Sequence, residues 1–416
     1  MGIMEVQIKK QSSLERRAEL GQYFTTHPLL KDTVVSFILN RPSTILEPCV
    51  GQGDLVAHIR EKLGDEVAFD MYEIDDTIEF CVGGGGGIGQ VTHGDFLVLQ
   101  RDIVKKYDTI VGNPPYVRTK RGNLYIDFVE TCYRLLADEG GELVFIVPAD
   151  FLKLTSAAAL LDDMMTHGTF THIFHPHNEK MFEGASIDVI VFRYCKKRGL
   201  AKSVLYNGEM RNITNTNGLI TFGTEDFVHA IITPTLFQDR FDIYVGLVTG
   251  KEEVFKNEEL GNLAVLNGED KVEQYIYIDS FPCDDPRTNA HLLQHKALLM
   301  ARGIRKFGEN NWFEWGAPRN LSAITKNIGR DCIYVYTLTR RNRVAFAGKV
   351  QHFGGGLLML VPKVTDVAEI TSYEINTIVS YLNSDAFKNN FMFSGRFKIG
   401  HRAISNSIIP PLPSAT

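Results

Sequence analysis

A short run with an unusual combination of side chains begins at residue 113. The apolar stretch Tyr107–Val111 leads through a glycine into Asn113–Tyr116, whose sequence is Asn-Pro-Pro-Tyr. Two prolines fix φ and cannot continue a sheet ladder, so the chain must leave the strand as a rigid turn. The turn presents an amide, free carbonyls and a ring at a strand's carboxyl end, where open α/β sheets bind ligands. These groups suit a planar molecule with an exocyclic amino group. Taken without the rest of the sequence, the same run could also be an ordinary turn that ends a strand.

Three segments upstream place further polar groups after successive predicted strands. One strand ends in a tight turn with Gly51 and Gly53, which lets a ligand approach the backbone and the following helix N-terminus. Glu73 follows the next strand, about twenty residues on, where a carboxylate can bind ribose hydroxyls. Asp95 and Phe96 follow a third segment, where they can hydrogen-bond and pack against an adenine. The turn lacks both the full dinucleotide fingerprint and the Lys-Ser/Thr of a phosphate-binding loop.

The order of these motifs carries a family resemblance. The segments Gln22–Thr25, Leu46–Pro48 with the two glycines, Tyr72–Asp75, Gly94–Phe96 and Asn113–Tyr116 resemble those of S-adenosylmethionine-dependent N6-adenine DNA methyltransferases of restriction–modification systems. With the cofactor motifs first and a long C-terminal region last, the layout is similar to their γ class. The resemblance extends motif by motif from about residue 20 to 197.

The resemblance implies S-adenosylmethionine as the cofactor, whereas a hydride cofactor would need the fuller glycine fingerprint. It places Glu47 on the α-amino group, Glu73 on the ribose and Asp95 on the adenine amino group, with Ile74 and Phe96 packing on the adenine ring. The complete expected cofactor site is Tyr23, Phe24, Thr25, Glu47, Pro48, Gly51, Gly53, Glu73, Ile74, Asp95, Phe96 and Asn113.

The acceptor side of the implied reaction explains the Asn-Pro-Pro-Tyr run. An adenine N6 lone pair is delocalised into the ring, so Asn113 Oδ1 and the Pro114 carbonyl would accept both amino hydrogens and aim the lone pair at the methyl group. Tyr116 would stack on a base that has left the duplex. Phe182, which precedes an apolar strand, would cover the opposite face, and a core phenylalanine is the alternative reading of it.

Composition bounds the class of protein. The chain has 416 residues and 44% hydrophobic content, which fits two globular domains with sizeable cores. It has no run of eighteen apolar residues and no signal-peptide core, so we expect a cytoplasmic protein, bacterial or from a phage, without membrane contact. The six cysteines are scattered and are interpreted as reduced thiols. No metal site is expected, and the neighbouring histidines His172, His175 and His177 are interpreted as structural.

Charge is unevenly distributed although the net charge is −6. Residues 287–349 hold twelve Lys or Arg residues against three acidic ones, and a second basic group follows at residues 388–402. Such clustering is typical of a phosphate-contacting surface, and a solvated basic face is the alternative. From this clustering and the resemblance, we expect the following residues to bind DNA: Arg340, Arg341, Arg343, Arg396 and Lys398.

The pattern along the chain predicts an α/β domain at residues 1–199 and an α+β domain at residues 200–416. Near-continuous apolar runs at 142–148 and 187–194 indicate a sheet covered on both faces. The resemblance makes the first domain a Rossmann-like methyltransferase domain with a mixed, mostly parallel sheet, and the second a DNA target recognition domain. The pentaglycine Gly83–Gly87 indicates a surface loop, natural or engineered.

The implied function is methylation of the N6 amino group of a flipped-out adenine in double-stranded DNA, which protects that DNA from a cognate restriction endonuclease. We expect a monomer with that endonuclease as a functional partner. Methylation of RNA adenine or of a protein glutamine amide, and a catalytically idle DNA-binding subunit, are the alternatives. The recognition sequence is not readable, because side-chain identity does not map to bases without docking geometry.

Overall fold

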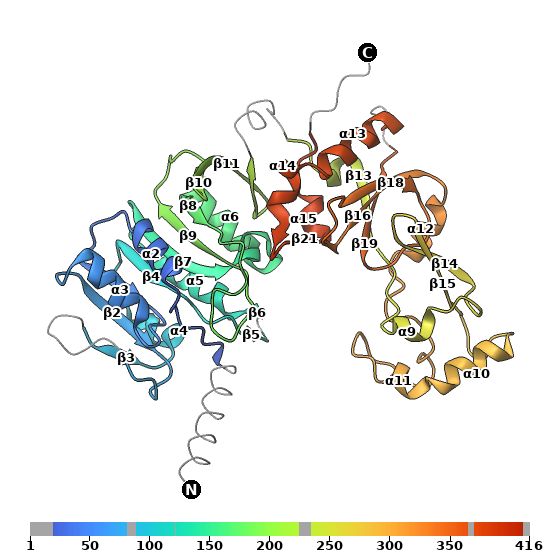
Figure 1. Cartoon of the computed structure of the whole chain (residues 1–416), viewed down its shortest axis with the longest axis horizontal. Helices are drawn as coiled ribbons and strands as arrows, with labels where there is room; N and C mark the ends of the chain where they lie inside the picture. The colour runs from blue at the N-terminus through green and yellow to red at the C-terminus, as the bar shows by residue number, and fades with distance from the viewer. Residues whose placement is uncertain (1–19, 81–88, 121, 224–233, 365–369, 411–416) are drawn as a thin grey trace, which may run out of the picture. The chain divides into compact units, whose positions relative to one another are not determined.

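The computed structural model describes residues 20–80, 89–120, 122–223, 234–364 and 370–410 (Figure 1). The pentaglycine Gly83–Gly87 lies outside the described residues. The chain forms two compact units, Met1–His229 and Ala230–Thr416. The domain boundary expected at residue 199 is too early, because three further strands continue the sheet of the first unit up to Gly223.

One ten-stranded sheet organises the first unit, in the order β12-β11-β10-β8-β9-β7-β4-β1-β2-β3. Strands β3, β2, β1, β4 and β7 run parallel, β9 is antiparallel to both β7 and β8, and β10–β12 extend the far edge. This mixed sheet confirms the predicted Rossmann-like α/β fold. The strands are β1 (Thr44–Glu47), β2 (Ala68–Glu73), β3 (Val91–His93), β4 (Thr109–Gly112), β7 (Gly141–Pro148), β8 (Thr169–Phe174), β9 (Val189–Lys196), β10 (Ser203–Tyr206), β11 (Glu209–Thr216) and β12 (Leu219–Gly223).

Helices cover both faces of this sheet. On one face, Leu30 of α2 and Val56 of α3 belong to the same buried cluster as Val144 of β7. On the other, Tyr194 of β9 meets the Tyr133 ring of α5 at 5.8 Å and donates a hydrogen bond to a carbonyl of α6. The helices are α2 (Pro28–Phe37), α3 (Asp54–Leu63), α4 (Phe96–Leu99), α5 (Leu124–Leu135) and α6 (Ala158–His167). A small hairpin of two strands, β5 (Arg118–Thr119) and β6 (Gly122–Asn123), precedes α5.

Local sequence sets where helices α2 and α3 begin. Pro28 occupies the first turn of α2, and the His27 ring nitrogen accepts a hydrogen bond from Leu29 N–H as a cap. Gly53, in a left-handed conformation with φ 87°, starts α3, and Asp54 places a negative charge in its first turn. Parallel strands β1, β2 and β4 are neighbours, so the segments that follow them meet at one edge of the sheet.

The second unit is α+β, as predicted. Its main sheet has the order β13-β19-β16-β18, all antiparallel, and two smaller sheets pair β14 with β15 and β17 with β21 and β20. The strands are β13 (Phe241–Val245), β14 (Leu263–Gly268), β15 (Lys271–Tyr275), β16 (Asp331–Tyr336), β17 (Leu338–Thr339), β18 (Ala345–Lys349), β19 (Leu357–Pro362), β20 (Met392–Phe393) and β21 (Arg396–Lys398). The helices are α8 (Phe237–Arg240), α9 (Glu252–Phe255), α10 (Pro286–Gln294), α11 (Lys296–Met300), α12 (Leu321–Asn327), α13 (Ser372–Leu382), α14 (Asp385–Lys388) and α15 (His401–Ser405).

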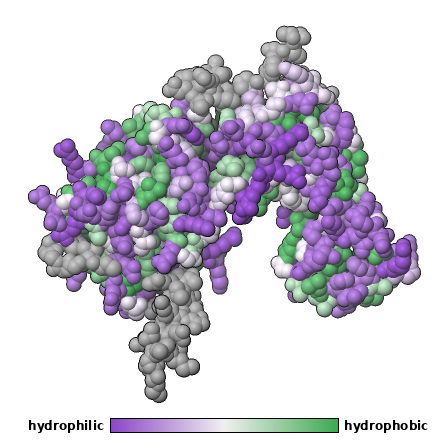
Figure 2. Space-filling view, viewed as in Figure 1, coloured by the Kyte–Doolittle hydropathy of each residue, from purple (hydrophilic) through white to green (hydrophobic). Residues whose placement is uncertain are grey.

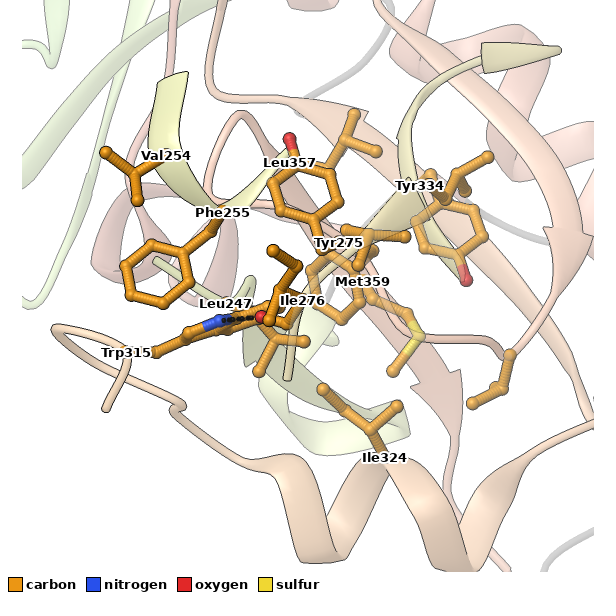
Figure 3. Close-up of a cluster of buried hydrophobic side chains, with 14 of the residues drawn as sticks. Leu247, Val254, Phe255, Tyr275, Ile276, Trp315, Ile324, Tyr334, Leu357 and Met359 are labelled. Carbon is orange, nitrogen blue, oxygen red and sulfur yellow. Dashed lines mark hydrogen bonds between the residues drawn. The ribbon is translucent and has the colours of Figure 1, made fainter. Parts of the chain in front are cut away.

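A second hydrophobic cluster holds this unit together (Figure 3). Trp315, 3% exposed, lies among Phe255, Tyr275 and Ile276, and its ring N–H donates a 2.8 Å hydrogen bond to the Ile276 carbonyl. The buried indole is thus packed and has its one donor satisfied. Among the described residues, none of the helices has the length and apolar character needed to cross a membrane.

Candidate functional site

A cavity lies at the carboxyl ends of β1, β2 and β4. Nine residues expected around the cofactor line it: Tyr23, Phe24, Pro48, Gly51, Glu73, Ile74, Asp95, Phe96 and Asn113. A smaller adjoining cavity shares several of these residues and adds Thr25 and Glu47. Gly53 lines neither cavity, and its position at the start of α3 accounts for its type. The structure therefore brings eleven of the twelve expected cofactor residues to one place.

The turn after β1 is tied to the end of β2. Gly51 has φ 57°, and a Cβ there would lie 3.0 Å from the Phe24 ring, so both conformation and space favour glycine. Its N–H donates a 2.8 Å hydrogen bond to Glu73 Oε2, while Glu73 Oε1 accepts a 2.9 Å bond from Asp75 N–H. The buried Glu73 carboxylate thus fixes the loop geometry, and the proposed ribose contact would use its remaining acceptor positions.

Three further lining residues are the groups expected around an adenine. Ile74 is 53% exposed and lines the cavity, whereas Phe96 is buried against the Phe128 ring, with centroids 5.8 Å apart. Asp95 Oδ1 accepts a 2.9 Å hydrogen bond from Leu97 N–H and so caps α4. This cap orients the exposed Asp95 carboxylate at the cavity wall.

Glu47 is a buried carboxyl group at the smaller cavity. It is 2% exposed, and its Oε1 accepts hydrogen bonds from Cys49 N–H at 3.2 Å and Cys49 Sγ at 3.5 Å. Burial, together with the nearby negative charge of Glu73, raises the Glu47 pKa to about 8 despite these bonds from Cys49. Within the described part of the chain no basic side chain forms an ion pair with it. A cationic ligand group would supply that missing charge.

This raised pKa predicts pH-dependent cofactor binding. Glu47 is mostly protonated in the free protein at neutral pH and must ionise to meet an ammonium group, so binding releases a proton. Affinity for S-adenosylmethionine should rise with pH by up to about tenfold per unit below pH 8. Above that it should fall, because a free α-amino group loses its own proton near pH 7.7–8.0, roughly.

Calorimetry in two buffers of different ionisation enthalpy would measure that proton release. Glu47→Gln should bind more weakly and lose the rise below pH 8, because an amide does not titrate in this range. A wild-type affinity that stays constant from about pH 5.5 to 7.5 would contradict the assignment of Glu47.

The Asn113–Tyr116 turn faces the same space. The Asn113 side-chain nitrogen donates to the Tyr23 carbonyl at 2.7 Å and to Thr25 Oγ1 at 3.1 Å. Its Oδ1 accepts a 2.5 Å hydrogen bond from the Tyr116 hydroxyl. The amide is thereby fully oriented, with its nitrogen toward the loop before α2.

The two rings expected to enclose a base are brought together, with a third beside them. Tyr116 and Phe182 have centroids 6.1 Å apart at 71°, and Tyr23 stacks on Tyr116 at 5.6 Å and 27°. Tyr23 also touches Phe182 at 5.8 Å. A base between two parallel rings needs about 7 Å between them, so a bound base requires these rings to move. Phe182 is 4% exposed, which also fits the core alternative.

The loop that carries Phe182 connects β8 to β9, and a contact between His175 and Asp188 joins its two ends. His175, 3% exposed, makes a 2.8 Å contact through Nε2 with Asp188 Oδ1, and its Nδ1 lies 3.1 Å from the Tyr206 hydroxyl. His175 therefore has a carboxylate partner that its spacing in the sequence did not reveal. No group of three or more potential metal-binding side chains occurs in the described ranges.

Ten residues not predicted as site residues also line the main cavity, and Gln22 and Cys49 are the two of them with a hydrogen-bonding side chain. Gln22 donates through Nε2 to Asp75 Oδ2 at 3.5 Å, and its buried Oε1 has no hydrogen-bond partner in the described structure. Cys49 lines both cavities beside Glu47. Gln22 begins the Gln22–Thr25 motif and Cys49 directly follows Pro48, so each is next to a predicted site residue, and that position is the only signal in the sequence.

The expected DNA-binding residues meet on the second unit. β17 pairs with β21, with Leu338 opposite Lys398, so two basic segments more than fifty residues apart lie side by side. Figure 2 shows strongly hydrophilic residues over this part of the unit. Arg340 is exposed, whereas Arg341 lies over the Tyr336 ring at 5.6 Å and Arg343 pairs with Glu269 at 2.8 Å. Arg396 is half-buried, and its Nε has no partner within the described residues.

Comparison with known proteins agrees with this site. Residues 89–182 match the model of the Eco57I restriction-modification methylase family. The chain is a relative of restriction–modification DNA methyltransferases. It is 25% identical to Type II methyltransferase M.HincII of Haemophilus influenzae over 240 residues, which is 51% of this chain and 44% of that protein. The chain therefore spans less than half the length of that relative.

Two further relatives extend this comparison. Type II methyltransferase M.MjaIV of Methanocaldococcus jannaschii is 27% identical over 219 residues, 45% of this chain and 68% of that protein. The solved structure of the Type IIL restriction-modification enzyme MmeI in complex with DNA is similar over 90% of this chain and 63% of its own, with a TM-score of 0.59 and 10% identity. At that identity the likeness concerns the fold alone.

S-adenosylmethionine, the cofactor of this methyltransferase class, fits the residues present. Glu47 offers a buried carboxyl that pairs with no cation among the described residues, which suits an ammonium group. Gln22 Oε1 is a buried acceptor with no donor in the part of the chain that the structure describes, and Ile74 exposes an apolar surface to the same cavity. A ligand with an ammonium group, hydroxyl donors and a flat ring would satisfy all three.

Proposed function

We propose that the protein transfers the methyl group of S-adenosylmethionine to the N6 amino group of a flipped-out adenine in double-stranded DNA, as the modification enzyme of a restriction–modification system. The observation that carries this proposal is the Asn113–Tyr116 turn at the edge of the cofactor cavity. The oriented amide oxygen of Asn113 accepts a hydrogen bond from the Tyr116 hydroxyl there, and the Phe182 ring lies 6.1 Å from the Tyr116 ring. Methylation of the adenine N6 would protect the DNA from a cognate endonuclease.

Orientation and electrostatics can perform this reaction without a covalent enzyme intermediate. Bound S-adenosylmethionine supplies an electrophilic methyl group. Asn113 Oδ1 and the Pro114 carbonyl would accept the two amino hydrogens, so that the nitrogen lone pair is held in line with that methyl. The N–C bond forms as the S–C bond breaks, and the cationic product then loses one proton to water.

Product identity tests the proposal. The protein should incorporate tritiated methyl groups into duplex DNA, and nucleoside analysis should find the label in N6-methyladenine. Plasmid methylated in this way should resist one restriction endonuclease at each modified site. Label in cytosine, in RNA alone or in a protein glutamine would overturn the proposed acceptor, and the last two outcomes would select the alternative substrates.

Salt dependence tests the proposed DNA surface. Lys398 is exposed on β21 and Arg340 is exposed next to β17, so both can reach phosphates or base edges. Binding should weaken steeply with salt, and Lys398→Ala should weaken binding to all sequences alike and lower the salt slope by about 1. Arg340→Ala should instead relax discrimination at one base pair, by about 1–3 kcal/mol.

Fluorescence anisotropy at several salt concentrations, with specific and unrelated duplexes, measures both effects. Lys62→Ala is the matched control, because Lys62 is an exposed cation of the first unit. A slope that falls equally in the Lys62 and Lys398 variants would remove Lys398 from the DNA surface.

A further inference from the structure

We propose that Thr25 is a positioning residue that holds the Asn113 amide in its productive orientation. The Thr25 hydroxyl oxygen accepts a 3.1 Å hydrogen bond from the Asn113 side-chain nitrogen. The inference rests on the proposed function, because it concerns the residue that would bind the acceptor amino group. It reassigns Thr25, which the family resemblance places at the cofactor.

The orientation of this amide decides whether Asn113 can act. The oxygen and nitrogen ends of an asparagine side chain are nearly the same size, but only the oxygen can accept an amino hydrogen. A rotated Asn113 would direct N–H groups at the amino group of the target. It would also place its oxygen against the Tyr23 carbonyl, so that two acceptors would face each other.

Two acceptors on the loop before α2 enforce the useful orientation. The Tyr23 carbonyl is 2.7 Å from the Asn113 nitrogen, and Thr25 Oγ1 takes its second hydrogen. The bond from the Tyr116 hydroxyl to Asn113 Oδ1 agrees with this assignment, because that oxygen then faces a donor. Of these three partners, only Thr25 accepts from the Asn113 nitrogen through a side chain, so only this acceptor can be removed by a substitution.

Burial makes this contact a fixed part of the fold. Thr25 is 6% exposed, so water cannot readily replace its hydroxyl if the hydroxyl is removed. The contact joins residues 88 positions apart and connects a loop that lines the cofactor cavity with the acceptor turn after β4. The proposed role is to orient Asn113 across this connection, and the experiments below separate it from a direct contact with S-adenosylmethionine.

Two substitutions separate the hydroxyl from its packing. Thr25→Val keeps the shape and removes the acceptor, whereas Thr25→Ser keeps the acceptor and removes a methyl group. With DNA and cofactor saturating, the single-turnover rate of Thr25→Val should fall about tenfold, the scale of one lost hydrogen bond. Its dissociation constant for S-adenosylmethionine should stay within about twofold of wild type, and Thr25→Ser should restore the rate.

Each other result overturns the proposal. A parallel loss of rate and cofactor affinity in Thr25→Val would make Thr25 a cofactor ligand. An unchanged rate would give it no role, and a Thr25→Ser rate as low as that of Thr25→Val would assign the effect to packing. The three rates are measured with whichever acceptor the wild-type protein methylates. An acceptor other than adenine would overturn the proposed function, but the comparison of the wild-type, valine and serine rates would still decide the role of Thr25.

A spectroscopic measurement needs neither substrate nor turnover. Nitrogen-15 NMR of the free protein should show one Asn113 side-chain amide whose two protons exchange slowly with water, identified by its loss in Asn113→Ala. In Thr25→Val one proton should exchange several-fold faster, while Thr25→Ser should resemble wild type. Equal exchange in the wild-type and valine proteins would show that the hydroxyl does not hold the amide.

Discussion

Replacing Asn113 with alanine is expected to lower the single-turnover methyl-transfer rate by about 10²–10³-fold, the cost of removing one preorganised acceptor. Its Oδ1 is oriented by bonds from its nitrogen to Tyr23 and Thr25, so the loss removes a group already aimed at the acceptor. Affinity for S-adenosylmethionine should change by no more than a few-fold. Rapid-quench measurement with saturating DNA separates the two quantities.

Two variants serve as controls for the Asn113 result. Asp95→Ala should show the opposite pattern, with weaker cofactor binding and a near-normal rate at saturation, because Asp95 lines the cavity wall. Asn123→Ala removes an asparagine whose side chain makes no capping bond to α5, and it should leave both quantities unchanged. A near-normal rate for Asn113→Ala would refute its proposed role.

Replacing Phe182 with alanine should weaken the flipped-out state of the target base by about 1–3 kcal/mol, the value of stacking one base on a ring. A duplex with 2-aminopurine at the target position should gain fluorescence on binding the wild-type protein, because the base leaves its stack. That gain should shrink in Phe182→Ala.

Burial of Phe182 requires a control for stability. Met181 is 3% exposed in the same cluster but has no ring, so Met181→Ala should lower the free energy of unfolding without reducing the fluorescence gain. If the two variants lose stability alike and both retain full fluorescence and methylation, Phe182 is a core residue only.

Periodicity and strand composition predicted most of the fold. The apolar runs at 142–148 and 187–194 located β7 and β9, which lie side by side in the sheet. Among the missed elements are β10–β12, and strand β11 near the sheet edge is polar and mostly half-buried, with one buried residue. Without a buried face it shows no alternating pattern, so the domain boundary was placed too early.

The candidate site was predictable as a set of residues but not as a network. Parallel strands bring their carboxyl ends together, so Glu47, Glu73 and Asn113 could be expected at one edge. The partners of those groups could not, because they lie across the fold: Glu73 binds Gly51, and Asn113 binds Thr25. Hydrogen bonds between distant segments depend on loop paths that local propensity does not determine.

The bond between the Tyr116 hydroxyl and Asn113 Oδ1 occupies one of the two acceptor positions of that oxygen. The same hydroxyl lies 3.2 Å from the Ile146 carbonyl, so it has a second acceptor within reach. A flipped adenine can therefore donate to the open position of Oδ1, or take the place of a hydroxyl that turns to Ile146. A base that presents only a carbonyl here can do neither, because it has no hydrogen to donate. Selection for an amino group would begin with that difference.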